Sequence, residues 1–315
     1  MNIPYYVEFM VLPDNLFGDT KWFFENIIGN GKSGIARVFE IACEKSGTDN
    51  TYTADDFDVR DVSPTLYSHC YIVDFPAENA EPPLCKSAII TFDFRETVTP
   101  RYFTLEYGEE GRCFLAEITA DGKHINYGVA PDGEELIEKV IMTAFGWEEF
   151  GGFSEEESIL KSAEDYQIPS LRSLVENIYL KALFDYETPL FINEIFNKER
   201  FFVYSVFKRV YKLFDKPVPF GMTDILVELH NLEDENKVLF IIDMPKGYLY
   251  ETECLQIYIA YDIDKPSRRY ITFNYNGDNE TSLNCYDLEQ GNSGPFEAPA
   301  DEKEFYNALL QIAFE

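Results

Sequence analysis

The segment of residues 121–131, DGKHINYGVAP, carries the side chains of this chain that are best suited to recognition chemistry. It brings an imidazole, a carboxamide and a phenol together in His124, Asn126 and Tyr127. Such groups, placed where a loop meets a strand, can form a small binding site for a ligand or a partner. The alternative is structural, with His124 and Asn126 satisfying backbone groups in a local turn. The sequence leaves both interpretations open.

A predicted strand at residues 101–107, RYFTLEY, could extend this site. Its residues alternate between apolar and polar types, which is typical of a half-exposed antiparallel strand. Phe103 and Leu105 should point toward the core. We expect the opposite face to be exposed and to join the candidate site through Tyr102, Thr104 and Glu106.

Patterns for metal or nucleophilic chemistry are weak. The three histidines, His69, His124 and His230, stand in no HExxH motif, and the six cysteines form no CxxC pair. A dyad of Cys70 or Cys113 with His124 would depend on long-range folding, and buried structural cysteine is the simpler interpretation. We therefore predict no metal site and no cofactor.

The loop GNGKSG at residues 29–34 ends like a phosphate-binding loop. The full GxxxxGK[ST] pattern requires a glycine at position 26, which is Asn26, and a strand before the loop. The preceding residues have helical periodicity instead. The loop is better interpreted as a turn between two helices.

A predicted helix near residues 201–216 carries a basic face in this acidic chain. Its cationic residues are Lys208, Arg209, Lys212 and Lys216. This face could dock an acidic segment, such as that of a second copy of the protein. Alternatively, it could pair with carboxylates of its own domain.

The elements around these residues appear twice, because the first half of the chain matches the second at a shift of about 168 residues. Tyr102 recurs as Tyr270, and the dipeptide Ala130–Pro131 recurs as Ala298–Pro299. The sequence thus predicts two copies of one domain, joined by an acidic linker. The boundaries are 1–146, 147–170 and 171–315.

Each copy reads as an α+β domain, with helices first, then a mainly antiparallel sheet of about five strands, then one helix. The predicted helices are 20–29, 34–45, 133–145, 171–185, 188–214 and 302–314. The predicted strands are 69–75, 88–94, 101–107, 112–119 and 124–129 in copy 1, and 224–230, 236–243, 254–262, 269–275 and 281–287 in copy 2.

The formal net charge is −31, and acidic residues outnumber basic ones in both halves. This charge argues against nucleic acid and anionic membranes as partners, since both bind clustered positive charge. An acidic surface instead attracts a basic protein. The N-terminus resembles no signal peptide, and the cysteine pattern suits a reducing compartment, so we expect a cytoplasmic protein.

These features favour a non-catalytic, bacterial-type protein–protein interaction module, such as an adaptor, a chaperone-like holder or a toxin-neutralising partner. The alternative is a small-molecule binding protein or enzyme, with its site near His124 and Tyr127 or in the cleft between the copies. A third possibility is a structural role in which the copies pack as a pseudo-twofold pair.

Overall fold

In the computed structural model, the chain forms two compact units, Met1–Trp147 and Glu148–Glu315. The structure describes residues 7–76, 84–93, 100–107, 112–149, 194, 197–232, 236–243, 254–262, 268–275, 281–287 and 289–314. The predicted helix 171–185, most of the predicted linker 147–170 and the start of helix 188–214 lie outside these residues. The predicted domain boundaries therefore stay a prediction.

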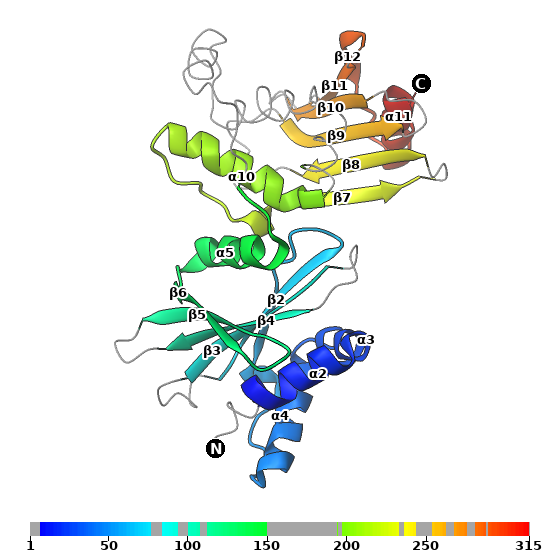
Figure 1. The fold of residues 1–315 in the computed structure, drawn as a ribbon. Coiled ribbons are helices and arrows are strands. Elements are labelled where there is room, and N and C mark those ends of the chain that lie inside the picture. Colours follow the sequence, from blue (N-terminus) through cyan, green and yellow to red (C-terminus); the bar gives the residue numbers. More distant parts are fainter. Residues whose placement is uncertain are drawn as a thin grey trace. The chain divides into compact units, whose positions relative to one another are not determined.

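Unit 1 begins with short helical segments, continues as an antiparallel sheet and ends with a helix (Figure 1). The helical segments are η1 (Val7–Val11), α2 (Leu12–Gly18), α3 (Thr20–Phe23), η2 (Phe24–Ile28), α4 (Lys32–Ser46) and η3 (Ala54–Asp56). The strands are β1 (Asp58–Asp61), β2 (Ser68–Asp74), β3 (Leu84–Asp93), β4 (Arg101–Tyr107), β5 (Cys113–Ile118) and β6 (His124–Val129), followed by α5 (Gly133–Phe145). The strands pair in chain order, β1 to β6.

Unit 2 has the same sequence of sheet and final helix. The described part begins with α10 (Asn197–Leu213) and η7 (Met222–Asp224). The strands are β7 (Leu226–Asn231), β8 (Lys237–Asp243), β9 (Cys254–Asp262), β10 (Arg268–Tyr275), β11 (Thr281–Asp287) and β12 (Gly291–Glu297), and α11 (Glu302–Phe314) follows. These strands also pair antiparallel in chain order. The predicted α+β class is confirmed.

The predicted number of about five strands per sheet is wrong, because each sheet has six. The missed strands are β1, with sequence DVRD, and β12, with sequence GNSGPFE. Both are edge strands with almost no apolar residues, and β12 contains glycine and proline, which are depleted in strands. Pairing with a neighbouring strand, rather than local propensity, makes these segments extended.

The two sheets share an irregularity that supports the internal repeat. Strands β5 and β6 shift register between Phe114 and Ala116, and β11 and β12 shift between Leu283 and Cys285. The bulged strand carries a glycine with positive φ in each case, Gly128 at 85° and Gly294 at 104°. Bulges occupy defined positions in a fold. The two similar halves therefore fit a tandem duplication.

Both faces of the unit 1 sheet are covered. One face packs against α2, η2 and α4 in a core that includes Ile90 and Tyr102, and α5 covers the other face (Figure 1). Tyr102 and Thr104 are each 0% exposed. The expected exposed face of strand 101–107 is therefore wrong, because the N-terminal helices, which include the unpredicted η1 and α2, pack onto it. Within the described residues, no helix is long and apolar enough to cross a membrane.

Candidate functional site

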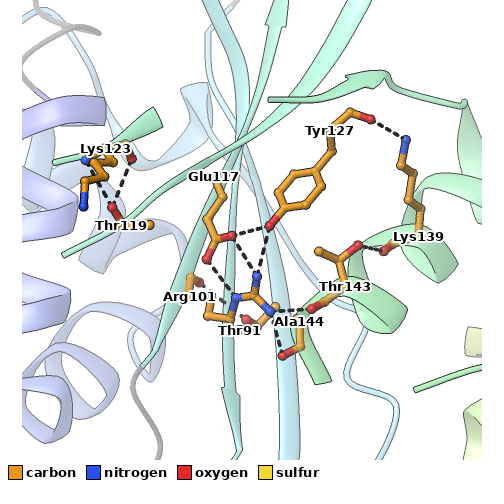
Figure 2. A network of polar contacts seen from close by, with 9 residues as sticks. All are labelled: Thr91, Arg101, Glu117, Thr119, Lys123, Tyr127, Lys139, Thr143 and Ala144. Atoms are coloured by element: carbon orange, nitrogen blue, oxygen red, sulfur yellow. Dashed lines mark hydrogen bonds and ion pairs between the residues drawn. The ribbon is translucent and has the colours of Figure 1, made fainter. Parts of the chain in front are cut away.

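A polar cluster in unit 1 centres on an arginine–carboxylate pair between adjacent strands (Figure 2). Arg101, at the start of β4, donates from Nε to Glu117 Oε1 at 2.8 Å and from Nη2 to Glu117 Oε2 at 2.7 Å. The Glu117 side chain on β5 is only 8% exposed. This bidentate geometry is the strong form of an ion pair.

The same guanidinium holds the end of helix α5. Arg101 Nη1 donates to the backbone carbonyl of Thr143 and, at 3.1 Å, to that of Ala144. The last carbonyls of a helix lack partners within the helix, so a cation at this position satisfies them and opposes the helix dipole. Arg101 thus joins β4, β5 and α5 at one point.

Tyr127 on β6 completes the cluster, which we call the arginine brace: Arg101, Glu117 and Tyr127. The phenol donates to Glu117 Oε2 at 2.6 Å and accepts a hydrogen bond from Arg101 Nη2 at 3.2 Å. Lys139 Nζ on α5 donates to the Tyr127 carbonyl at 3.0 Å. The phenol therefore acts as donor and acceptor at once.

The electrostatics of the brace favour its charged form. Burial alone would raise the pKa of Glu117, but hydrogen bonds from Arg101 and Tyr127 and the charge of Arg101 outweigh burial and hold it below its usual range. Burial and the hydrogen bond to Glu117 raise the pKa of Tyr127. The carboxylate is thus ionised and the phenol protonated at neutral pH, which is the state that the hydrogen bonds require.

Unit 2 repeats the arginine of this brace. Arg269, the counterpart of Arg101, donates from Nε to Asp287 Oδ2 at 2.9 Å and from Nη1 to the Ile312 carbonyl of α11 at 2.6 Å. Ile312 corresponds to Thr143 in the repeat. Because both units tie the final helix to the sheet in this way, the arginine–carboxylate pair serves the fold.

The other predicted site residues lie on the opposite face of the sheet. His124 Nε2 is 2.8 Å from Glu106 Oε1, and Thr104 Oγ1 donates to the same oxygen at 2.8 Å. His124 pairs in register with Ile118, which pairs with Tyr102, so all belong to one face. The structure therefore separates the predicted site into a Thr104–Glu106–His124 group and Tyr127.

Asn126 follows the structural alternative, because its Oδ1 accepts a hydrogen bond from the Gly128 backbone at 2.6 Å. In unit 2, Thr272 and Asn274 correspond to Thr104 and Glu106, and Asn274 Nδ2 donates to Thr272 Oγ1 at 3.0 Å. The polar contact is retained there but the carboxylate is not. A binding role for the His124 group stays a prediction.

The remaining motifs occupy structural positions. The glycine loop at 29–34 joins η2 to α4 as a turn, with Gly31 N donating to Ile28 O at 2.9 Å. Burial, with the charge of Asp61, raises the pKa of the Cys70 thiol, so it stays protonated and poorly nucleophilic. No group of three or more metal-ligating side chains occurs among the described residues.

The predicted basic face lies on α10 and just after it. Lys208 Nζ is 2.9 Å from Glu149 Oε1, a residue of the predicted linker that belongs to the same compact unit. Lys212 and Lys216 are exposed, and Arg209 is half-buried. Docking of an acidic segment on Lys208, Arg209, Lys212 and Lys216 stays a prediction.

Sequence reasoning missed a pocket in unit 2. It has a volume of about 860 Å³ and lies between β12 and α11, with Arg269, Cys285 and Asp287 among its lining residues. The signal was present in the repeat, where Tyr127 and Lys139 of copy 1 correspond to Pro295 and Ala308 of copy 2. Both smaller residues line the pocket.

No protein-family model, no curated protein and no solved structure matches this chain. Function must therefore be argued from the charges, contacts and pocket described above.

Proposed function

We propose that this protein is a non-catalytic interaction module that binds a basic protein partner in the reducing cytoplasm. The observation that carries the proposal is the net charge of −31, together with a group of exposed carboxylates within residues 44–61 of unit 1. Neither nucleic acid nor an anionic membrane suits such a surface, since like charges repel. A basic protein suits this surface, because opposite charges accelerate the encounter of the two proteins and favour that partner over others.

Exposed carboxylates are frequent along the chain from the end of α4 through the edge strand β1, a segment that we call the acidic edge. It consists of the exposed residues Glu44, Asp49, Asp55, Asp56, Asp58 and Asp61. Lys32 lies 3.5 Å from Asp58, and Arg60 lies 3.2 Å from Asp74, so these nearby cations already face carboxylates of unit 1. The acidic edge therefore has carboxylates in excess.

The position of β1 adds a backbone component. It is the first strand of the sheet and, among the described strands, pairs with β2 alone, so its outer side faces away from the sheet. An extended basic segment could lie along this side and pair its cations with Asp58 and Asp61. Extended peptides add to sheet edges in this manner.

The test is binding of a fluorescent lysine-rich peptide to the full chain, followed by anisotropy at several salt concentrations. We expect saturable binding that weakens steeply with salt, because exposed ion pairs are screened beyond a Debye length of about 8 Å at physiological ionic strength. The double variant Asp49→Asn/Asp55→Asn should weaken binding several-fold. Asp56 is left intact because its carboxylate caps η3 through the Thr53 backbone.

The matched control is Glu302→Gln/Glu304→Gln, which changes the net charge equally at exposed positions of α11. It should leave peptide affinity nearly unchanged. Equal losses in the two double variants would mean that only total charge matters and would remove the acidic edge as the binding surface. An affinity independent of salt would refute the proposal altogether.

A further inference from the structure

The pocket in unit 2 occupies the place that Tyr127 fills in unit 1. In the alignment of the two copies, Arg269 corresponds to Arg101 and Pro295 corresponds to Tyr127. Both Arg269 and Pro295 line the pocket. Unit 1 therefore contains, as part of its own chain, a phenol in the position that is open in unit 2.

Three replacements reduce the side-chain volume around the pocket. Glu117 becomes Cys285, Tyr127 becomes Pro295 and Lys139 becomes Ala308, and each new side chain is smaller. Both sheets carry a bulge near this position, and the bulge between β11 and β12 lies one residue from the place that the repeat gives to the bulge between β5 and β6. At about 860 Å³ the pocket falls within the usual range for small-molecule sites, roughly 300–1,000 Å³.

Two polar side chains that line the pocket, Arg269 and Asp287, have hydrogen-bonding positions that the described residues do not fill. Asp287 accepts hydrogen bonds from Arg269 Nε and from the backbone of Glu289 and Gln290, which leaves about one of its four acceptor sites. Arg269 donates from Nε and Nη1, and no described residue accepts from Nη2. One hydroxyl that both donates and accepts would use both remaining positions.

The charge of the pocket argues against an anionic ligand. Arg269 is already paired with Asp287, and Glu297 at the wall adds a further carboxylate. An anion would therefore meet net repulsion. The apolar walls are formed by Pro295, Phe296 and Ile312.

We propose that this pocket binds a neutral phenol, with its ring between β12 and α11 and its hydroxyl between Arg269 and Asp287. The hydroxyl would donate to the carboxylate and accept from the guanidinium, as the Tyr127 hydroxyl does with Glu117 and Arg101 at 2.6 and 3.2 Å. The phenol can come from a free aromatic molecule or from a tyrosine side chain of a peptide.

The experiment titrates the full chain with p-cresol, the analogue of the tyrosine side chain, and follows unit 2 resonances by NMR. Toluene, which lacks only the hydroxyl, is the matched ligand. We expect saturable binding of p-cresol and at least about tenfold weaker binding of toluene, because the hydroxyl bonds to charged groups. Similar affinities for the two would overturn the proposal.

Two variants locate the site. Ala308→Trp should fill the pocket from α11, and Ser293→Phe should fill it from β12, and each should abolish p-cresol binding. The control Asn307→Trp places the same bulk at an exposed position of α11 outside the pocket lining, and should bind as wild type. Binding that survives both filling variants would place the phenol elsewhere and reject the site.

Unit 1 offers a positive control in the same chain. Tyr127→Ala should remove the internal phenol, destabilise unit 1 and create a cavity beside Arg101 and Glu117, and p-cresol should then restore stability more than toluene. A tyrosine-containing peptide distinguishes the two sources of the phenol. If the peptide displaces p-cresol, the pocket is a tyrosine-binding site. If the peptide does not displace p-cresol, the pocket is a site for free phenols.

Discussion

Replacement of Arg101 by methionine should destabilise unit 1 by about 3–5 kcal/mol. This is the usual cost of removing one member of a buried ion pair and leaving the other charge unpaired. Glu117, 8% exposed, would lose its counter-ion, and the carbonyls of Thr143 and Ala144 would lose their donor. Methionine retains much of the apolar stem, so the loss reflects mainly charge and hydrogen bonds. Denaturant unfolding monitored by hydrogen exchange in α5 would measure it.

Two further variants separate the ion pair from general effects. Arg60→Met breaks an exposed pair with Asp74 on the same sheet and should cost no more than about 1 kcal/mol. Arg101→Met/Glu117→Gln removes the unpaired carboxylate and should recover part of the stability. If Arg60→Met and Arg101→Met were equally destabilising, the arginine brace would have no special role.

The pH dependence follows from the lowered pKa of Glu117 in the folded state. Because that pKa lies below the unfolded value of about 4.3, the pair contributes its full stability above the unfolded value. This contribution is lost as the pH falls through the folded pKa. The stability difference between wild type and Arg101→Met should therefore narrow in acid, and a constant difference from neutral pH to about pH 3 would contradict the assignment.

The substitution Gly34→Ala should also destabilise unit 1 strongly, by about 3 kcal/mol or more. A Cβ at this position would lie 2.0 Å from the Ile27 carbonyl oxygen and 2.7 Å from its carbonyl carbon. Both are backbone atoms of η2, so relief requires α4 to move from the core. This clash outweighs the roughly 1 kcal/mol that alanine normally gains over glycine in a helix.

The matched control is Gly18→Ala in α2, where an added Cβ would meet no atom within 4 Å. That variant should be neutral or slightly stabilising. Thermal unfolding of both variants measures the contrast. A Gly34→Ala protein as stable as wild type would show that η2 and α4 are farther apart than described.

The repeat and the apolar periodicity were sufficient to predict the α+β class and the similarity of the two halves. Helices such as α5 and α11 and strands such as β3 and β9 carry strong local patterns, so their existence followed from residue order. Edge strands β1 and β12 have almost no local apolar pattern, and they become strands only because they pair with β2 and β11. The strand count therefore depended on tertiary contacts.

The candidate site was predicted only in part. The sequence identified Glu106, His124 and Tyr127 as side chains of interest, but could not show that the sheet places Tyr127 on the opposite face from the other two. The prediction that Tyr102 and Thr104 are exposed was wrong, because N-terminal helices distant in sequence cover both residues.

By itself, the sequence determined the duplication, the α+β class and the acidity, since all three are properties of residue order and composition. Only the tertiary structure showed that Arg101 and Arg269 hold the final helices, and that one copy encloses a phenol where the other leaves a pocket. The physical reason is that hydrogen bonds and cavities depend on side chains brought together from strands and helices far apart in the chain.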